Sequence, residues 1–411
     1  MIVMLNLYLI KRSVFTFMIN KFKLIDFKIL IPYLILNITG IIMIFSASSY
    51  NLDQLGKSSL STASKQLFFL VVSIAMITVI YRTNLKIYQT ALFNKILIGA
   101  SATMLLATSV LGLGETIGGA QRWIDIGPIT LQPSEFIMIT IILYASYIFS
   151  LRQDRINTHF KETILAPTII IGILILLVFF QPNVGGAAIL TMIFLAILFS
   201  SGIPYLYMVV GGLITGVFTL IMTQLVMFKD GWLLPGKFSH VYDRFSVVRD
   251  PFSDQLGNGF QLVNSYYAIY NGGWFGLGLG QSIQKKGFLP VAETDFIFSV
   301  TIEELGLIRA FIILGLLLFL ILRIFAIGIK ATSSFNSLVA IGVGSAILIQ
   351  VFVNLGGILG LIPMTGVPFP FMSYGGSNLL TLSILIGFVL NISADEKRKK
   401  IYTLALSMTE H

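Results

Sequence analysis

The stretch LGLIRAFIILGLLLFLIL (Leu305–Leu322) decides the fold class, because all 18 of its residues are apolar except Arg309. A helix of that length rises about 27 Å, close to the hydrocarbon thickness of a bilayer. The preceding run, Leu289–Gly306, contains four carboxylates: Glu293, Asp295, Glu303 and Glu304. Ionisable groups at the mouth of a membrane helix are costly to keep there, so this run is a candidate functional site.

The composition of the whole chain supports the same fold class. Of its 411 residues, 56% are hydrophobic and only 11% are charged, whereas soluble proteins carry about 25% charged residues. The sequence therefore predicts an all-α polytopic membrane protein. About ten apolar segments are long enough to span a bilayer, near residues 28–48, 66–81, 96–113, 135–150, 164–180, 185–202, 205–228, 296–322, 335–357 and 376–392.

The basic residues predict the orientation, because Lys and Arg gather on the cytoplasmic side of membrane proteins. One side of the predicted bundle holds seventeen of them: Lys11, Arg12, Lys21, Lys23, Lys28, Arg82, Lys86, Lys95, Arg152, Arg155, Lys161, Arg323, Lys330 and the run Lys397–Lys400. The short loops on the other side hold three: Lys57, Lys65 and Arg122. We therefore expect one membrane domain, 1–411, with a cytoplasmic N-terminal segment (1–27) and a cytoplasmic tail (393–411).

The charge distribution, the cysteine and histidine content and the N-terminal sequence argue against several functions and features. The net charge of +9 is concentrated at the predicted cytoplasmic ends, which favours topology anchors near anionic lipid over nucleic-acid binding. The chain has no cysteine, and its three histidines lie far apart, so neither disulfides nor a thiolate or histidine metal site is predicted. The apolar Met1–Ile10 is followed, not preceded, by basic residues, so no cleavable signal peptide is expected.

The long segment 229–294 is predicted to be a large extracellular loop between the seventh and eighth helices. Loops of this length are usually functional or disordered, and this one is too rich in aromatic residues for disorder. Its basic residues include Arg244, Arg249, Lys285 and Lys286. Aromatic faces beside amides are typical of sugar-binding surfaces, but an ordinary packed loop has the same composition.

A second outer segment, Gly118–Phe136, places a cation, an indole and a carboxylate in one short loop: Arg122, Trp123 and Glu135. An anionic, partly apolar ligand would suit that combination. Two structural explanations are equally open, because Glu135 in the first turn of a helix complements the helix dipole and Arg122 with Trp123 could form an interfacial anchor.

The carboxylates of the acidic run fall into two groups by their position along the eighth predicted helix. Thr294 or Asp295 could simply cap the eighth helix, whereas Glu303 and Glu304 lie about 12–13 Å further along it. Arg309 is five residues beyond Glu304 and is therefore not its i+4 partner, so a partner from another helix is expected. Further on, the glycines and prolines of 354–377 predict irregular backbone near membrane depth, which is tolerated only inside protein or beside a polar cavity.

Together these motifs resemble the SEDS family (FtsW, RodA and SpoVE), the membrane proteins that build bacterial peptidoglycan. The resemblance covers nearly the whole chain at matching spacing. It rests on Asp26, Phe45–Ser49, Arg122-Trp123, Gln132–Phe136, Gln181-Pro182, Thr294–Phe296, Glu303–Gly306 and Ser373–Gly376. The segments Asn271–Gly276 and Gln284–Pro290 are more similar to the division branch, FtsW, than to RodA.

The resemblance implies an inverting glycosyltransferase that polymerises lipid II outside the membrane during septal synthesis, with undecaprenyl diphosphate as leaving group. It implies Asp295 as the catalytic base. Substrate or diphosphate contacts would come from Arg122, Trp123, Glu135, Arg244, Arg249, Lys285 and Lys286, with Glu303, Glu304, Gln132 and Ser373 in support. No cofactor is certain, although Mg²⁺ or Mn²⁺ would be compatible; a class B penicillin-binding transpeptidase and other division proteins would be partners.

The sequence departs from the family pattern at some positions. Many members carry lysine three residues after the glutamate of Gln132–Phe136, where this chain has Met138. Val291 and Glu293 also replace the usual residues before Thr294, and Asn183 replaces a common aspartate. A RodA-type elongation polymerase, a lipid II flippase and a divisome scaffold stay open as alternative functions.

Overall fold

The computed structural model describes residues 21–109, 114–117, 120–126, 129–156, 158–228 and 239–408. Ten apolar helices make up most of this part of the chain. Nine of them are long enough to cross a membrane, and α8 is slightly shorter. Their bounds are α2 Phe27–Gln54, α3 Ser61–Arg82, α4 Ala91–Ser109, α5 Pro133–Leu151, α7 Phe160–Phe180, α8 Val184–Ser200, α9 Tyr205–Met227, α12 Ile297–Lys330, α13 Ser334–Ile358 and α14 Gly376–Ser407.

These helices confirm the predicted fold class and each of the ten predicted segments. The main difference is length, because α2, α12 and α14 extend well beyond their apolar stretches. The predicted tail 393–411 is not a separate segment as far as it is described, since α14 continues through it to Ser407. The orientation of the bundle in the membrane stays a prediction.

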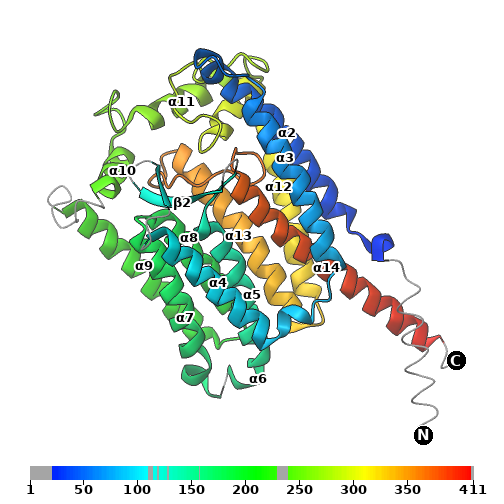
Figure 1. The fold of residues 1–411 in the computed structure, drawn as a ribbon. Coiled ribbons are helices and arrows are strands. Elements are labelled where there is room, and N and C mark those ends of the chain that lie inside the picture. The colour runs from blue at the N-terminus through cyan, green and yellow to red at the C-terminus, as the bar shows by residue number, and fades with distance from the viewer. Residues whose placement is uncertain are drawn as a thin grey trace, which may run out of the picture.

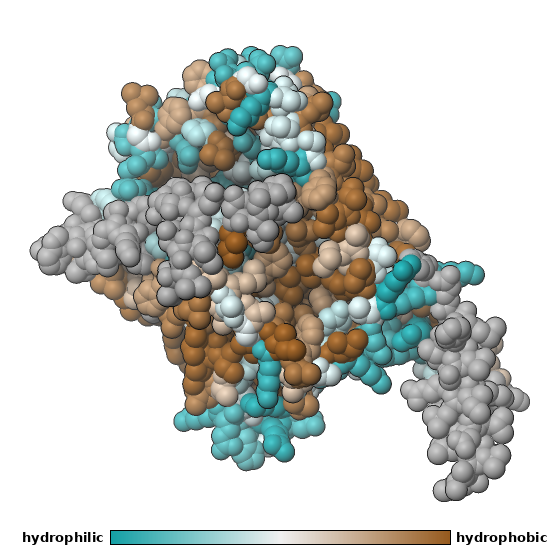
Figure 2. All heavy atoms as spheres, in the orientation of Figure 1, coloured by the Kyte–Doolittle hydropathy of each residue, from teal (hydrophilic) through white to brown (hydrophobic). Residues whose placement is uncertain are grey.

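The packing explains why the chain exposes so much apolar surface. A buried core runs along α5, α12, α13 and α14, and α14 lies against α3 while α12 lies against α13 (Figure 1). On the face that Figure 2 shows, apolar side chains cover much of the middle of the molecule and hydrophilic ones gather towards its ends. Helix α9 has no buried residue in its most apolar part among the side chains that the structure describes. An apolar belt between polar ends is the surface expected in contact with lipid.

The connection between α4 and α5 contains a small sheet, which the sequence analysis did not predict. Three antiparallel strands pair in the order β1-β2-β3 and comprise Gly114–Ile117, Ala120–Ile126 and Ile129–Leu131. Ile124 pairs with both Gly114 and Leu131 across the sheet. Strands this short offer too few alternations for a period of two to stand out in the sequence.

The segment 239–296 is largely ordered into helices and tight turns. Helix α10 spans Ser239–Arg249 and α11 spans Phe260–Gly272. The remaining short helices are η1 Lys21–Leu24, η2 Ile87–Gln89 and α6 Gln153–Ile156. The sheet, α10 and α11 lie at one end of the bundle, and η1, α6 and the C-terminal part of α14 lie at the other (Figure 1).

Two glycines fix the break in α12 that follows the acidic run. Gly306 has φ +82°, which interrupts the helix just after the acidic run, and Gly276 of the preceding loop has φ +80°. A Cβ on Gly276 would lie 2.3 Å from the Glu304 carbonyl oxygen, so only glycine fits. Leu277 N–H donates to Glu303 O at 2.9 Å, and Leu307 N–H donates to Gly273 O at 2.9 Å. Gly276 therefore passes directly against the backbone of α12.

Candidate functional site

Asp295 lies in the turn just before α12 and is half-buried. The N-cap of α12 is Phe296, and no side chain caps this helix. Thr294 Oγ1 donates instead to Val291 O at 3.0 Å. The alternative in which Thr294 or Asp295 serves as an N-cap is therefore wrong. Because the Asp295 carboxylate is not engaged as a cap, it is available to a ligand.

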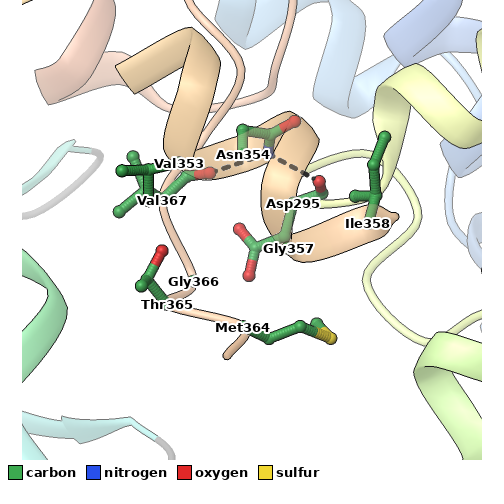
Figure 3. Close-up of a pocket in the computed structure, with 9 residues that line it drawn as sticks. All are labelled: Asp295, Val353, Asn354, Gly357, Ile358, Met364, Thr365, Gly366 and Val367. Atoms are coloured by element: carbon green, nitrogen blue, oxygen red, sulfur yellow. Dashed lines mark hydrogen bonds between the residues drawn. The ribbon is translucent and has the colours of Figure 1, made fainter. Parts of the chain in front are cut away.

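The backbone around Asp295 is held by two buried polar side chains. Asn354 of α13 donates from Nδ2 to Asp295 O and to Val367 O, both at 2.8 Å (Figure 3). Ser373 Oγ donates to Thr294 O at 2.7 Å and accepts from Phe369 N–H at 2.7 Å. Both residues hold the turn through its carbonyl groups and leave the Asp295 carboxylate unconstrained.

The carboxylate of Asp295 lies in a small hollow beside the Met364–Val367 backbone (Figure 3). Its Oδ2 would be 3.4 Å from a Cβ added to Gly366, whose φ is +73°, so the chain passes close to the carboxylate there. Burial raises the pKa of Asp295 to about 6, while the charge of Arg244 opposes the rise. A carboxylate with this pKa is ionised at neutral pH and basic enough to accept a proton.

A second, larger cavity of about 150 Å³ lies next to this hollow. The two share the Thr365–Val367 backbone. Four of the predicted site residues line the larger cavity: Trp123, Gln132, Glu135 and Arg244. They come from β2, the start of α5 and α10, so segments more than a hundred residues apart meet here. The structure thus brings carboxylates, a guanidinium and an indole to two adjoining spaces.

Arg244 lines the larger cavity, and its positive charge also acts on Asp295 in the neighbouring hollow. Its guanidinium donates from Nη1 to Met364 O at 2.9 Å. Burial lowers the pKa of Arg244 while Asp295 raises it, and an arginine stays charged despite such a shift. A fixed cation beside the cavity would attract a phosphate group.

Glu135 occupies the first turn of α5, after Pro133 at the helix start, as predicted. It accepts a hydrogen bond from Ser377 Oγ of α14. Met138, at the position where many family members carry lysine, is buried and accepts from Gln350 Nε2 at 3.6 Å. Glu135 is therefore held by a hydroxyl instead of a cation.

Glu303 and Glu304 are completely buried and fully engaged. Glu303 accepts from Ser282 Oγ, from the N–H groups of Ile283 and Gln284 at 3.2 Å each, and from Asn271 Nδ2 at 3.3 Å. Glu304 forms an ion pair with Lys285 at 2.8 Å and accepts from Ser46 Oγ of α2 at 2.7 Å. The expectation of a partner from another helix is met only by the Ser46 hydroxyl of α2, because the cation, Lys285, lies in the loop before α12.

Three predicted diphosphate contacts are not brought to this cavity. Lys285 is buried and paired with Glu304. Arg249 and Lys286 are exposed, and neither lines the cavity or the Asp295 hollow. For Lys285 the physical reason is that a buried ammonium needs a counter-charge, which Glu304 supplies. The side chain of Arg122 lies outside the described part of the chain.

Sequence reasoning did not single out Asn354 and Gln350, both on α13. Asn354 lines the hollow and Gln350 lines the larger cavity. Each has a buried side-chain oxygen without a hydrogen-bond partner among the described residues. A buried amide without a hydrogen-bond partner costs free energy. An amide side chain within an apolar helix was therefore the feature of the sequence that could have indicated these two residues.

The described residues contain no group of three or more His, Asp or Glu side chains placed to hold a metal ion. The hollow supplies Asp295 and the cavity supplies Glu135. Mg²⁺ is often bound by one or two carboxylates together with substrate phosphates. The donors present would therefore fit a divalent cation that a diphosphate substrate also binds.

The sequence comparisons identify close relatives. The family described as "Cell cycle protein" (FtsW, RodA, SpoVE) matches residues 27–398. The "Probable peptidoglycan glycosyltransferase FtsW" of Enterococcus hirae is 44% identical over 392 residues, covering 94% of this chain and 97% of that protein. "Stage V sporulation protein E" of Bacillus subtilis is 33% identical, covering 90% and 96%.

Solved structures agree with these relatives. One described as "Structural coordination of polymerization and crosslinking by a peptidoglycan synthase complex" matches with a TM-score of 0.72 at 26% identity, covering 90% of this chain and 98% of that one. The rod shape determining protein RodA of Thermus thermophilus matches with a TM-score of 0.64 at 22% identity, covering 90% and 97%, and shows the fold alone. The chain therefore belongs to the FtsW/RodA/SpoVE family.

Proposed function

We propose that this protein is a peptidoglycan glycosyltransferase of the division type, which polymerises lipid II on the outer face of the cytoplasmic membrane at the septum. The observation that carries the proposal is the Asp295 carboxylate, half-buried with a raised pKa beside a cavity that Arg244 lines. The relatives named peptidoglycan glycosyltransferase at 44% and 41% identity support the same activity.

The proposed reaction is one displacement. Asp295 accepts the proton of the acceptor sugar hydroxyl, and the oxygen of that hydroxyl attacks the anomeric carbon of the donor. The bond from that carbon to the diphosphate breaks, and undecaprenyl diphosphate leaves with the electron pair. An α-linked donor thereby gives a β-1,4 bond by inversion.

Arg244 is placed to stabilise the negative charge that develops on the leaving diphosphate, because it lines the cavity as a cation. Trp123 lines the same cavity with its indole, which suits the apolar face of a sugar. Glu135 and Gln132 would fix the hydroxyl and amide groups of the disaccharide. Any Mg²⁺ or Mn²⁺ would be shared with the diphosphate and would add positive charge there.

The test is polymerisation of lipid II by the purified protein together with its cognate class B transpeptidase. Wild type should form glycan strands, and Asp295→Asn should not. Asp53→Asn is the matched control, because Asp53 is an exposed carboxylate at the end of α2. Normal polymerisation by Asp295→Asn would remove the assignment of the base.

The same preparation separates the alternative functions. Transport of lipid II across vesicles without polymerisation by wild type would favour a flippase, and neither activity would favour a scaffold. Complementation of a division defect, with failure to complement an elongation defect, is expected for the division type. The opposite result would favour a RodA-type elongation polymerase.

A further inference from the structure

A cavity of about 560 Å³ lies at the end of the bundle opposite Asp295, between α12 and the C-terminal part of α14. Five basic residues line it: Arg323, Lys330, Lys397, Lys399 and Lys400. Glu396 is the one carboxylate in the wall as described. This is the end that the basic-residue count predicts to be cytoplasmic, and the proposed glycosyltransferase reaction does not use it.

The carboxylates around this cavity do not neutralise it. Glu396 is occupied by Lys399 at 2.9 Å, by the N–H and hydroxyl of Thr332, and by Asn336. Asp26 Oδ2 lies 2.6 Å from Arg323 and 3.6 Å from Lys397. Asp395 is paired with Arg398 and Lys399 at 3.0 Å each. Neither Lys330 nor Lys400 forms an ion pair with a described residue, and both are exposed. The cavity therefore keeps an excess of positive charge.

One buried donor also lacks an acceptor. Arg323 donates from Nη2 to Asp26, but its Nε–H is buried and has no hydrogen-bond partner among the described residues. A buried guanidinium N–H without an acceptor is costly. This Nε–H itself is out of reach of the cavity, but 28% of the Arg323 side-chain surface is exposed. A phosphate in the cavity would contact that exposed part, since Arg binds phosphate through several N–H groups.

The surroundings place this cavity at a membrane surface. Helix α14 has 32 residues, about 48 Å, and so exceeds the roughly 30 Å of a hydrocarbon core. Its last part projects beyond the neighbouring helices (Figure 1). There Ile401, Leu404 and Met408 are exposed on one helical stripe beside the basic run. A helix with a basic face and an apolar stripe lies at the lipid interface.

We propose that this cavity binds the phosphodiester headgroup of an anionic phospholipid from the cytoplasmic leaflet. The phosphate lies between Arg323 and the free ammonium groups of Lys330 and Lys400. The lipid's glycerol and upper acyl chain rest against Ala326 and Ile327, which form the apolar part of the wall. A soluble phosphate would use the cations alone, whereas a phospholipid uses both parts of the cavity.

The test uses the full chain in nanodiscs of phosphatidylcholine doped with phosphatidylglycerol, with retained lipid counted by native mass spectrometry. We expect one phosphatidylglycerol to remain bound to wild type. Each cation near an anionic lipid contributes about fivefold in affinity, so Lys330→Gln with Lys400→Gln should weaken retention roughly 25-fold. Lys330→Arg with Lys400→Arg should preserve it.

The matched control is Lys86→Gln with Lys161→Gln, which removes the same charge from exposed lysines at the same predicted membrane face. Equal retention by the two Gln variants would overturn the proposal, because only general surface charge would then matter. Displacement of the lipid by inorganic phosphate at comparable affinity would also overturn it, since the apolar wall would then contribute nothing. Unchanged thermal unfolding of each variant confirms that the fold is intact.

Discussion

Two parts of one acidic run have opposite environments. Glu303 and Glu304 are completely buried, and hydrogen bonds or an ion pair occupy both carboxylates. Asp295, eight residues earlier in the chain, is half-buried, and its carboxylate faces a hollow whose neighbouring cation is Arg244. A carboxylate whose oxygens are all engaged can fix structure but cannot accept a proton. The difference supports the proposal that Asp295, and not Glu303 or Glu304, acts as the base.

The largest expected effect is on polymerisation activity, when the half-buried carboxylate of Asp295 and the buried carboxylate of Glu304 are each replaced by an amide. Asp295→Asn should lower lipid II polymerisation by about 10²–10⁴-fold, the usual contribution of a general base. It should leave thermal unfolding unchanged or raise its midpoint, because a desolvated carboxylate is removed. Glu304→Gln should lower the unfolding midpoint, and its activity should be lost only in proportion to the loss of folded protein. A Glu304→Gln protein that folds normally but is inactive would contradict the comparison.

The next effect concerns the buried pair itself. Lys285→Met leaves Glu304 as a buried charge without a cation, which should destabilise the protein by about 3–5 kcal/mol. The double change Lys285→Met with Glu304→Leu should recover most of that loss, because two apolar side chains need no counter-charge. Thermal unfolding in detergent measures both. Failure of the double variant to recover would mean that the pair does more than hold the loop to α12.

A smaller effect is expected from pH. The pKa of Asp295 is raised to about 6, so the ionised base is lost as pH falls through that value. Polymerisation should be level above it and fall about tenfold per unit below it. Folding stability should change in the opposite direction. Because the pKa of Asp295 is raised in the folded state, the folded protein binds more protons between the unfolded-state pKa and the folded-state pKa, so this residue's contribution to stability increases as pH falls through that range. Initial rates across the pH range, with unfolding midpoints measured at each pH, test both directions.

The helices could be predicted from the sequence because each is a long apolar stretch, and only such stretches satisfy the lipid environment. The short sheet before α5 and the helices α10 and α11 could not be predicted from length and hydropathy. The extension of α14 to Ser407 was also missed, because its basic run ends the apolar pattern while the helical backbone continues.

The site shows the same division between local and distant information. Asp295, Glu135 and Arg244 could be identified from motifs of adjacent residues and from the family resemblance. The role of Lys285 could not, because its partners Ser46 and Glu304 are set by contacts between distant segments. Free lysines in a polar loop suggest ligand binding, and only the tertiary structure shows that this one is paired.

The smallest expected effect concerns the support of the Asp295 turn. Ser373→Ala removes the hydrogen bond to Thr294 O and leaves Phe369 N–H without its acceptor, a loss of about 1–3 kcal/mol. Ser64→Ala is the matched control, because Ser64 is an exposed helical serine whose hydroxyl donates only to Ser61 O in the described structure. If Ser373 positions the turn, kcat should fall while the pH limb near 6 stays in place, because the carboxylate's own surroundings are unchanged. A shift of that limb without a fall in kcat would mean that Ser373 acts on the charge of Asp295 and not on its position.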